Sequence, residues 1–410
     1  MAAAASNRAR AGPSATLLAL ALGVGAGVAA PSPARADDAA PLSDERILGT
    51  TGSGLRLQSV TMRATAFDQY GHGYQSQAGP VLGPGSERAT ISEGQAEVIM
   101  KQGDRWTHRV WVPVDVVSAA SPDAIDNGPR SADVVSSASH QVTGGTFDWT
   151  ATYKVDRATD LSARNALHLE QPFRSWNTGL TATRSFADEC TVLSAGVIGL
   201  LDWFDRFDVT GHRHGETSRS GTTGSVSLTQ VLTPTTVANV NYGLTVLNGT
   251  LGNTWNSVPL ASGDRGPELL PSQRVRHALV GRASQFLPWN GALRGYYRFY
   301  ADDWGIVAHT VEGLLMQRLS AAFYVGALYR FHTQTGATFF TTLAPVDAPL
   351  QVADSKLAPL DSHTLGGRIV ADFPVAGGVR ALHFELGVER YYRTNDLQMN
   401  IVTWATGFRF

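Results

Sequence analysis

The chain has 410 residues, a formal net charge of -2, 17% charged residues and a single cysteine, Cys190. The near-zero charge gives no basic surface for nucleic acid, and one cysteine excludes a disulfide-stabilised scaffold within the chain. No run in residues 37–410 approaches the ~20 apolar residues of a membrane helix. The mean hydropathy of -0.09 is nevertheless typical of a transmembrane β-barrel, whose strands are apolar only at every second residue.

The first residues have the pattern of a secretory signal peptide. Two arginines precede an apolar run over 17–30, and Ala-Arg-Ala at 34–36 supplies a small-residue cleavage site. We therefore predict a signal peptide over 1–36, a periplasmic segment over 37–54 and one folded unit over 55–410. A membrane-spanning first helix is disfavoured, because the run is short and prolines follow it.

Alternation of apolar and polar residues dominates the remainder of the chain. The segment TFDWTATYKVD at 146–156 places aromatic or aliphatic residues at every second position. Such a strand has one apolar and one polar face. We count roughly sixteen segments of this kind, near 55–65, 89–101, 105–118, 146–156, 160–170, 175–186, 190–202, 221–232, 236–248, 274–287, 291–300, 306–318, 321–332, 362–373, 379–391 and 399–410.

The connections between these segments alternate in length. Those that follow even-numbered strands are short, and they include 102–104, 187–189, 233–235, 288–290, 319–320 and 374–378. Most connections that follow odd-numbered strands are long, namely 66–88, 119–145, 203–220, 249–273 and 333–361. A soluble sandwich has no reason to sort its loops in this way. An outer-membrane barrel does, because its short turns face the periplasm and its long loops face outward.

The final segment carries a second barrel signature. Val402, Trp404, Phe408 and Phe410 share one face, and the chain stops on an aromatic residue. This pattern resembles the signal by which outer-membrane barrels reach their assembly machinery. Since every backbone polar group must be paired in hydrocarbon, we expect the last strand to pair with the first. The predicted fold is all-β, a transmembrane antiparallel up-and-down β-barrel of about 16 strands with a porin-like diameter.

The segment YRFYADDWGIVAHTVE, which begins at Tyr297, crowds aromatic rings and charges of both signs into one predicted hairpin. Alternation places Tyr297 and Phe299 towards lipid, where amphipathic rings are favoured at the interface, and places Arg294 towards the lumen. If the turn occupies 301–305, the register brings Arg294 opposite Glu312. We therefore predict a salt bridge between these two side chains inside the barrel.

Three segments resemble a bacterial family known as domain of unknown function 3570. Residues 297–310 are similar to its Y-R-Y-Y-x-D-x-W-G-I-x-A-H-T element, residues 114–122 to V-D-x-V-S-G-A-S-P, and residues 228–234 to x-T-Q-V-L-T-P. The chain departs from the family at Ala119, where glycine is usual. The resemblance extends over about 58–410 and implies an outer-membrane barrel without an established activity. It also implies a link to redox export, through neighbouring genes for flavin attachment and thioredoxin-like proteins.

Charged residues with lumen parity are the candidate functional residues. They are Arg274, Arg276, Arg282, Arg294, Arg298, Glu312, Arg330, Arg368, Glu385 and Glu389. A basic wall facing acidic groups would create a transverse field that selects small charged or polar solutes. The same charges are also what any wet barrel interior requires. Asp123, Asp126 and Asp133 are constriction-loop candidates if their loop folds inward to meet the arginines; it could equally stand outside.

Other motifs carry weaker indications of chemistry. His-Arg-His-Gly-Glu at 212–216 could supply metal ligands, but further ligands at a diagnostic spacing are missing, so a solvated loop is favoured. Asp302 and Asp303 are interpreted as turn residues rather than metal ligands. The serines and His140 of the long gap over 119–145 have no fixed mutual geometry, which disfavours catalysis. We predict no catalytic residue, metal or cofactor, and no nucleic-acid partner.

These features predict an outer-membrane barrel that provides a passage for a small polar solute or an exported product, by diffusion past lumen charges. Two alternatives stay open. One is a plugged barrel that serves as a scaffold or export partner of a periplasmic redox system, and the other is a barrel hydrolase. The expected partners are outer-membrane lipid, the barrel-assembly machinery at Phe410 and a small polar solute, with a periplasmic protein in the plugged alternative.

Overall fold

The computed structural model describes residues 54–71, 89–119, 143–170, 173–208, 212–252, 257–375, 377–394 and 397–410. The predicted signal peptide lies outside these residues, as does the loop that carries Asp123, Asp126, Asp133 and His140. Within the described part of the chain, helices long and apolar enough to cross a membrane are absent.

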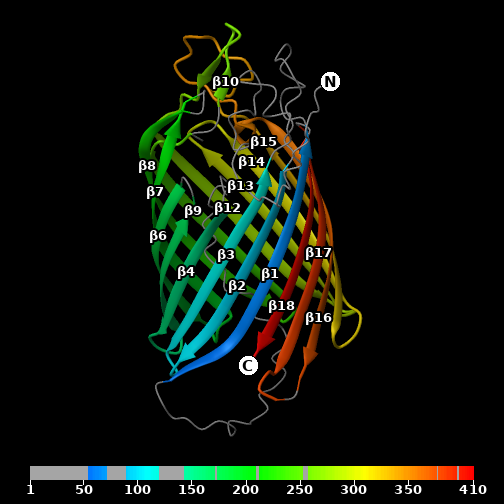
Figure 1. Ribbon diagram of the computed structural model, residues 1–410. Helices are drawn as coiled ribbons and strands as arrows, with labels where there is room; N and C mark the ends of the chain where they lie inside the picture. Colours follow the sequence, from blue (N-terminus) through cyan, green and yellow to red (C-terminus); the bar gives the residue numbers. More distant parts are fainter. Residues whose placement is uncertain are drawn as a thin grey trace, which may run out of the picture.

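Sixteen antiparallel strands close into one barrel (Figure 1). They are β1 (Leu55–Gly71), β2 (Ala89–Gln102), β3 (Trp106–Ala119), β4 (Thr143–Lys154), β5 (Thr159–Leu169), β6 (Phe173–Phe186), β7 (Thr191–Phe207), β8 (Arg213–Thr233), β9 (Thr236–Gly249), β12 (Gln273–Leu287), β13 (Gly291–Asp302), β14 (Val307–Arg318), β15 (Phe323–Gln334), β16 (Leu360–Pro374), β17 (Ala381–Arg393) and β18 (Leu397–Arg409). Each of the sixteen predicted segments is therefore confirmed as a strand.

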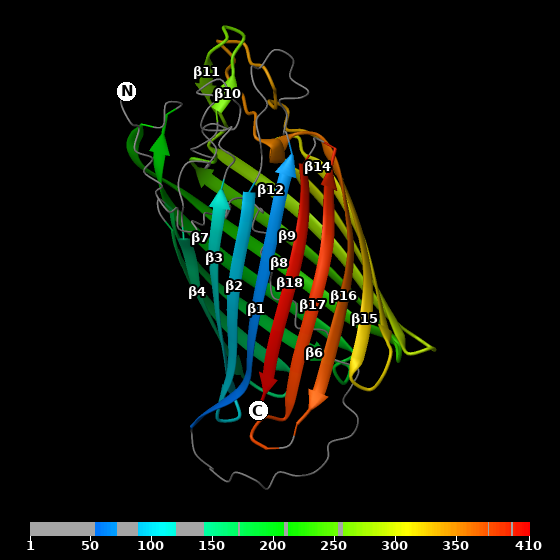
Figure 2. The same ribbon diagram turned by 45° about the vertical axis from the view of Figure 1, so that its right-hand side comes forward.

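The first and last strands pair and close the barrel, as predicted. Strand β18 pairs with β1 from Ser59 opposite Arg409 to Gly71 opposite Leu397, and Figure 2 shows β1 beside β18. The sheet consequently offers lipid no open edge, which hydrocarbon would not tolerate.

The outer face of the barrel is apolar at every second residue. Leu180, Val226, Leu293 and Trp404 are exposed although they are large and apolar, and their strand neighbours point inward because successive side chains alternate. This surface suits acyl chains rather than water. Together with closure, it makes the protein an outer-membrane-type barrel, as the alternation predicts.

The two ends of the barrel differ in their connections. The C-terminus lies at the end with short turns (Figure 1). In the turn between β6 and β7, Ala187, Asp188 and Glu189 all adopt positive φ, at 51°, 52° and 67°, and Cys190 follows them at an exposed position. The longest connections stand at the opposite end, so the predicted sorting of short and long connections between the two ends is confirmed for most of them. The predicted long connection over 203–220 is wrong, because β7 continues to Phe207 and β8 already begins at Arg213.

The outer end carries a packed structure that alternation does not predict. A small hairpin of β10 (Ser257–Pro259) and β11 (Arg265–Pro267) stands above the barrel (Figure 2), and single bridges tie the adjoining segment to the connection over 335–359, which contains the 3-10 turn η3 (Ser355–Leu357). Trp304, Ile306 and Ala337 form a buried core beneath it. We call the residues 257–272, 303–306 and 335–359 the outer cap.

Candidate functional site in the barrel lumen

The charged residues predicted for the lumen all lie on the inner face of the barrel. Along each strand they alternate with exposed apolar residues such as Leu279, Tyr297 and Leu386. Their positions are Arg274, Arg276 and Arg282 on β12, Arg294 and Arg298 on β13, Glu312 on β14, Arg330 on β15, Arg368 on β16, and Glu385 and Glu389 on β17.

The acidic residues of β17 are held by arginines of neighbouring strands. Arg368 lies 3.5 Å from Glu385 and 3.7 Å from Glu389, and Arg63 of β1 lies 3.7 Å from Glu385. Arg63 is a residue that the sequence analysis missed. Because these carboxylates are partly neutralised on their own wall, they contribute less to a field across the lumen than their formal charge suggests.

Two glycines let this network lie flat against the wall. A Cβ added at Gly326 would stand 2.8 Å from Cγ of Arg368, and one at Gly366 would stand 2.8 Å from Cγ of Glu389. Both glycines point into the lumen, so their missing side chains provide the space in which Arg368 and Glu389 rest. The network therefore lies close to the backbone of β15–β17.

Further inner-face ion pairs join other neighbouring strands. Arg164 Nη2 lies 2.6 Å from Asp148 Oδ2, Arg219 contacts Asp202, and Arg109 contacts Glu97. The side chains of Asp148 and Asp202 are only 2% exposed. Sequence analysis missed these pairs. Alternation along adjacent strands places these opposite charges on the lumen face, and this pattern could have revealed them.

The predicted salt bridge between Arg294 and Glu312 is wrong. Arg294 lies opposite Leu314, while Glu312 lies opposite Tyr296, and its carboxylate instead accepts a 2.7 Å hydrogen bond from Nε of Arg330. The register differs by two residues from the expected one, because Asp302 ends β13 and caps the turn that follows. A shift of two residues keeps every side chain on its predicted face.

On the β12–β13 wall only Arg274 forms an ion pair with a carboxylate among the described residues. We call three of the other arginines, Arg282, Arg294 and Arg298, the lumen arginine cluster. Arg282 donates a 3.1 Å hydrogen bond to Asn239 and its guanidinium lies 5.4 Å from the ring centre of Tyr296. Arg298 lies 5.4 Å from the ring of Tyr300. Arg282 and Arg294 are exposed to the lumen. Arg276 lies above the cluster on the same face.

A carboxylate without a cationic partner lies on the opposite side of the barrel from this cluster. Seven strands separate β12 from β2 in either direction round the barrel, through β9 to β3 and through β13 to β1. On the inner face of β2, Glu93 contacts Gln95 and Glu97 contacts Arg109. Glu93 has no cationic partner in the described part of the chain, so it is the acidic counterpart that the sequence analysis sought on β17.

Two charged or polar side chains of the segment at 212–216 contact neighbouring residues at the outer end of the barrel. Nε2 of His214 lies 2.8 Å from Asp208, and Glu216 pairs with Arg174 of β6. Among the residues whose placement is described, groups of three or more His, Cys, Asp or Glu side chains suited to a metal ion are absent. These contacts brace the outer end of β8.

The family profile described as "Protein of unknown function (DUF3570)" matches residues 199–404, which extend from β7 to β18. The chain belongs to this family. The DUF3570 match includes the strands that carry the lumen arginine cluster and two of the three segments that resemble the family, 228–234 and 297–310, so the resemblance is confirmed there. The third segment, 114–122, precedes the matched range. No curated protein matches the sequence.

Solved structures similar to this DUF3570 protein include a BenF-like porin from Pseudomonas fluorescens Pf-5, at 7% identity and a TM-score of 0.45, covering 86% of this chain and 99% of the porin. A Pseudomonas aeruginosa FadL homologue is similar at 10% identity and a TM-score of 0.44, covering 87% and 90%. A bacterial polysaccharide outer membrane secretin is similar at 9% identity and a TM-score of 0.43, covering 86% and 98%.

Proposed function

We propose that the protein provides a passage through the outer membrane for small polar solutes that carry negative charge. The observation that supports the proposal is the lumen arginine cluster, whose three guanidinium groups face water without a carboxylate partner among the described residues. Several other inner-face arginines are neutralised by neighbours, so the cluster concentrates positive charge on one wall.

The geometry suits transient binding of an anion. A guanidinium offers several N–H donors in one plane, which match the oxygens of a carboxylate, phosphate or sulfate group. The rings of Tyr296 and Tyr300 lie beside Arg282 and Arg298 and limit the directions in which these groups point. Glu93 on the opposite wall repels the same anion, so the field across the lumen draws the solute towards β12 and β13. Passage requires no covalent step.

Planar-bilayer recording tests the proposal directly. The purified full chain should conduct, and in a KCl gradient its reversal potential should show a preference for chloride. The triple variant Arg282→Gln, Arg294→Gln, Arg298→Gln should lower the anion-to-cation permeability ratio about fivefold, because a unit charge ~4 Å from an ion in water contributes about 1 kcal/mol.

A matched control keeps the net charge of the lumen constant. The double variant Arg330→Gln, Glu312→Gln removes one inner-face ion pair and should leave the permeability ratio unchanged. Absence of any current through the wild-type protein, or an unchanged ratio in the triple variant, would contradict the proposal.

A further inference from the structure

Three tyrosine–histidine pairs repeat on the outer face of the barrel. In each pair a tyrosine hydroxyl lies within hydrogen-bond distance of Nδ1 of a histidine on the next strand: Tyr242 and His277 at 2.8 Å, Tyr297 and His309 at 2.8 Å, and Tyr329 and His363 at 2.9 Å. The tyrosines are 42%, 43% and 46% exposed, and the histidines are exposed as well. One geometry thus recurs three times round the wall.

The pairs lie near the outer end of the barrel. Each histidine is within the first five residues of a strand that descends from the outer mouth, namely β12, β14 and β16. The rings of Phe299 and Phe331 lie 5.4 Å and 5.1 Å from His309 and His363. Amphipathic rings at this depth are typical of the layer in which acyl chains meet headgroups.

The hydrogen bond to Nδ1 determines what the histidine presents to that layer. We assign the phenol hydroxyl as the donor, because Nδ1 is the acceptor that lies within its reach on the lipid side. A neutral imidazole that accepts this hydrogen bond at Nδ1 carries its own proton on Nε2. Protonated imidazole also carries a hydrogen on Nε2. Nε2 of His277, His309 and His363 has no partner among the described residues, so each pair offers an unused N–H donor to the membrane.

A guanidinium extends the same row. Tyr392 lies opposite His363 across β16 and β17, and Arg390 shares the outward parity of Tyr392. The guanidinium of Arg390 lies 4.9 Å from the ring centre of Tyr392 and 4.8 Å from that of Tyr70 on β1. Nη1 of Arg390 donates a 2.6 Å hydrogen bond to Asn400 and Nη2 donates to Gln398. What Arg390 adds to the row past β16 is therefore a permanent positive charge.

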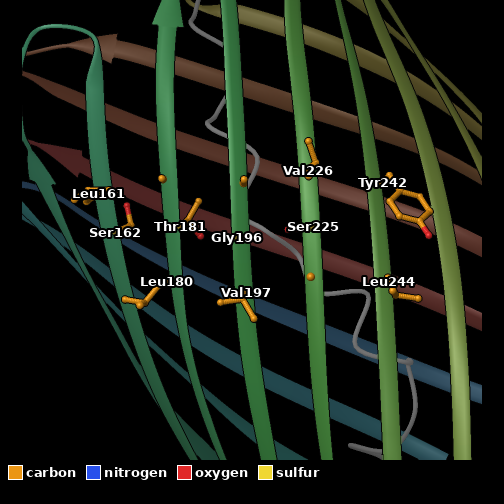
Figure 3. A pocket seen from close by; sticks show the side chains of 13 residues that line it. Leu161, Ser162, Leu180, Thr181, Gly196, Val197, Ser225, Val226, Tyr242 and Leu244 are labelled. Atoms are coloured by element: carbon orange, nitrogen blue, oxygen red, sulfur yellow. The ribbon is translucent and has the colours of Figure 1, made fainter.

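The remaining arc of the outer face is different. Between β5 and β9 it forms a shallow hollow of about 680 Å³, and Figure 3 shows Leu161, Leu180, Val197 and Val226 around it. Apolar side chains and small residues line this hollow, and Tyr242 lies at the edge where it meets the first Tyr–His pair. The hollow thus lies on the arc from β5 to β9, whereas the three Tyr–His pairs and Arg390 lie on the strands from β9 to β17.

We propose that the three Tyr–His pairs and Arg390 bind phosphate groups of lipids in the outer leaflet. A donor left without an acceptor at the edge of hydrocarbon is costly, whereas a phosphate accepts hydrogen bonds through several oxygens and its charge complements Arg390. Lipid phosphates are the acceptors that surround a membrane barrel at this depth. The belt would hold a ring of headgroups on one side of the protein, independently of any solute in the lumen.

Native mass spectrometry of the detergent-solubilised full chain tests this assignment, with bisphosphorylated lipid A and lipid A stripped of both phosphates as probes in EDTA. The wild type should bind the bisphosphorylated lipid about tenfold more tightly, a difference of about 1.4 kcal/mol, because hydrogen bonds to a charged phosphate are stronger than those to a neutral hydroxyl. The triple variant His277→Leu, His309→Leu, His363→Leu should remove most of this difference, because only Arg390 of the proposed phosphate-binding groups remains. Leucine suits a lipid-facing strand, and heat-modified gel mobility verifies that the barrel has folded.

His108 supplies a matched control. It lies on the outer face of β3 near the periplasmic end, where its Nε2 lies 3.1 Å from Gln102 and its ring stacks near Trp106 and Trp149. His108→Leu should leave lipid A binding unchanged. Equal binding of both lipids by the wild type, retention of the difference in the triple variant, or a dimer that keeps lipid off β12–β17 would each overturn the proposal.

Discussion

The outer rim and the middle of the β12–β13 wall both carry inward-facing arginine, and they use it in opposite ways. At the rim the side chain of Arg274 is 8% exposed and that of its partner Asp302 is 0% exposed. In the middle, Arg294 is exposed to the lumen and has no ion-pair partner among the described residues. The same residue type on the same face is structural where a carboxylate and a ring bury it, and available to solutes where water surrounds it.

The rim arginine is fixed from several directions. Its Nε lies 3.0 Å from Oδ2 of Asp302, and its guanidinium lies 4.2 Å from the ring centre of Trp304. Asp302 also accepts hydrogen bonds from the hydroxyl of Tyr300 at 2.7 Å and from the backbone amides of Trp304 and Ile306 at 3.1 Å and 3.0 Å. A buried carboxylate with this many donors organises the turn and the core of the outer cap at once.

Removing the rim carboxylate should have the largest effect. Asp302→Ala leaves Arg274 buried without its counter-charge and frees two turn amides, and breaking one partner of a buried pair costs about 3–5 kcal/mol. We expect the outer cap to open locally rather than the barrel to unfold. Limited proteolysis should then cut the connection over 335–359 at least a hundredfold faster than in the wild type.

The control for this variant removes the carboxylate of an inner-face pair lower on the wall. The side chains of Glu312 and Arg330 are 19% and 49% exposed, and such solvated pairs contribute roughly 0–1 kcal/mol. Glu312→Ala should therefore leave the cleavage rate of the cap nearly unchanged. Equal sensitivity of the two variants would mean that burial does not distinguish the rim from the lumen.

A glycine of the rim turn should show the next largest effect. Gly305 has φ of 88°, and a Cβ added there would lie 2.6 Å from Cγ2 of Thr338 in the cap. Gly305→Ala should destabilise the cap by about 2–4 kcal/mol through backbone strain and overpacking. Gly313, in the middle of β14, has no atom within 4 Å of its virtual Cβ, so Gly313→Ala should be tolerated. Hydrogen exchange of the cap amides would separate the two variants.

Alternation predicts the strands and the inner face because it reports which side of the sheet each residue occupies. It does not distinguish two registers that differ by two residues, because both keep every side chain on the same face. For this reason Arg294 was expected opposite Glu312. That register is set by Asp302, whose carboxylate accepts hydrogen bonds from the backbone amides of Trp304 and Ile306 in the turn. A pattern of apolar and polar residues contains no information about this capping, so the salt bridge of Glu312 with Arg330 could not be derived from it.

The outer cap and the Tyr–His pairs escaped prediction for a related reason. Their contacts join residues that are far apart in sequence, as when Ala344 bridges to Leu260, and pattern analysis of one strand at a time cannot see them. Alternation along β13 and β14 does place His309 on the same face as Tyr297. The Tyr242–His277 and Tyr329–His363 pairs form through the register between neighbouring strands, which the pattern of a single strand does not contain.

The smallest expected effect comes from removing a single tyrosine hydroxyl. Two tyrosines of β13 allow a comparison, because only one of them uses its hydroxyl at the rim. The hydroxyl of Tyr300 donates to Asp302 and lies 3.3 Å from Nη2 of Arg274, so Tyr300→Phe should weaken the cap by about 1.5 kcal/mol, the lower range for a hydrogen bond to a charged group. Tyr296 lies on the same face beside Arg282 and contributes its ring, which phenylalanine preserves. Tyr296→Phe should leave cap exchange unchanged. If both variants loosen the cap equally, the hydroxyl of Tyr300 has no particular role at the rim, and the contrast between rim and lumen would not depend on its hydrogen bond to the carboxylate.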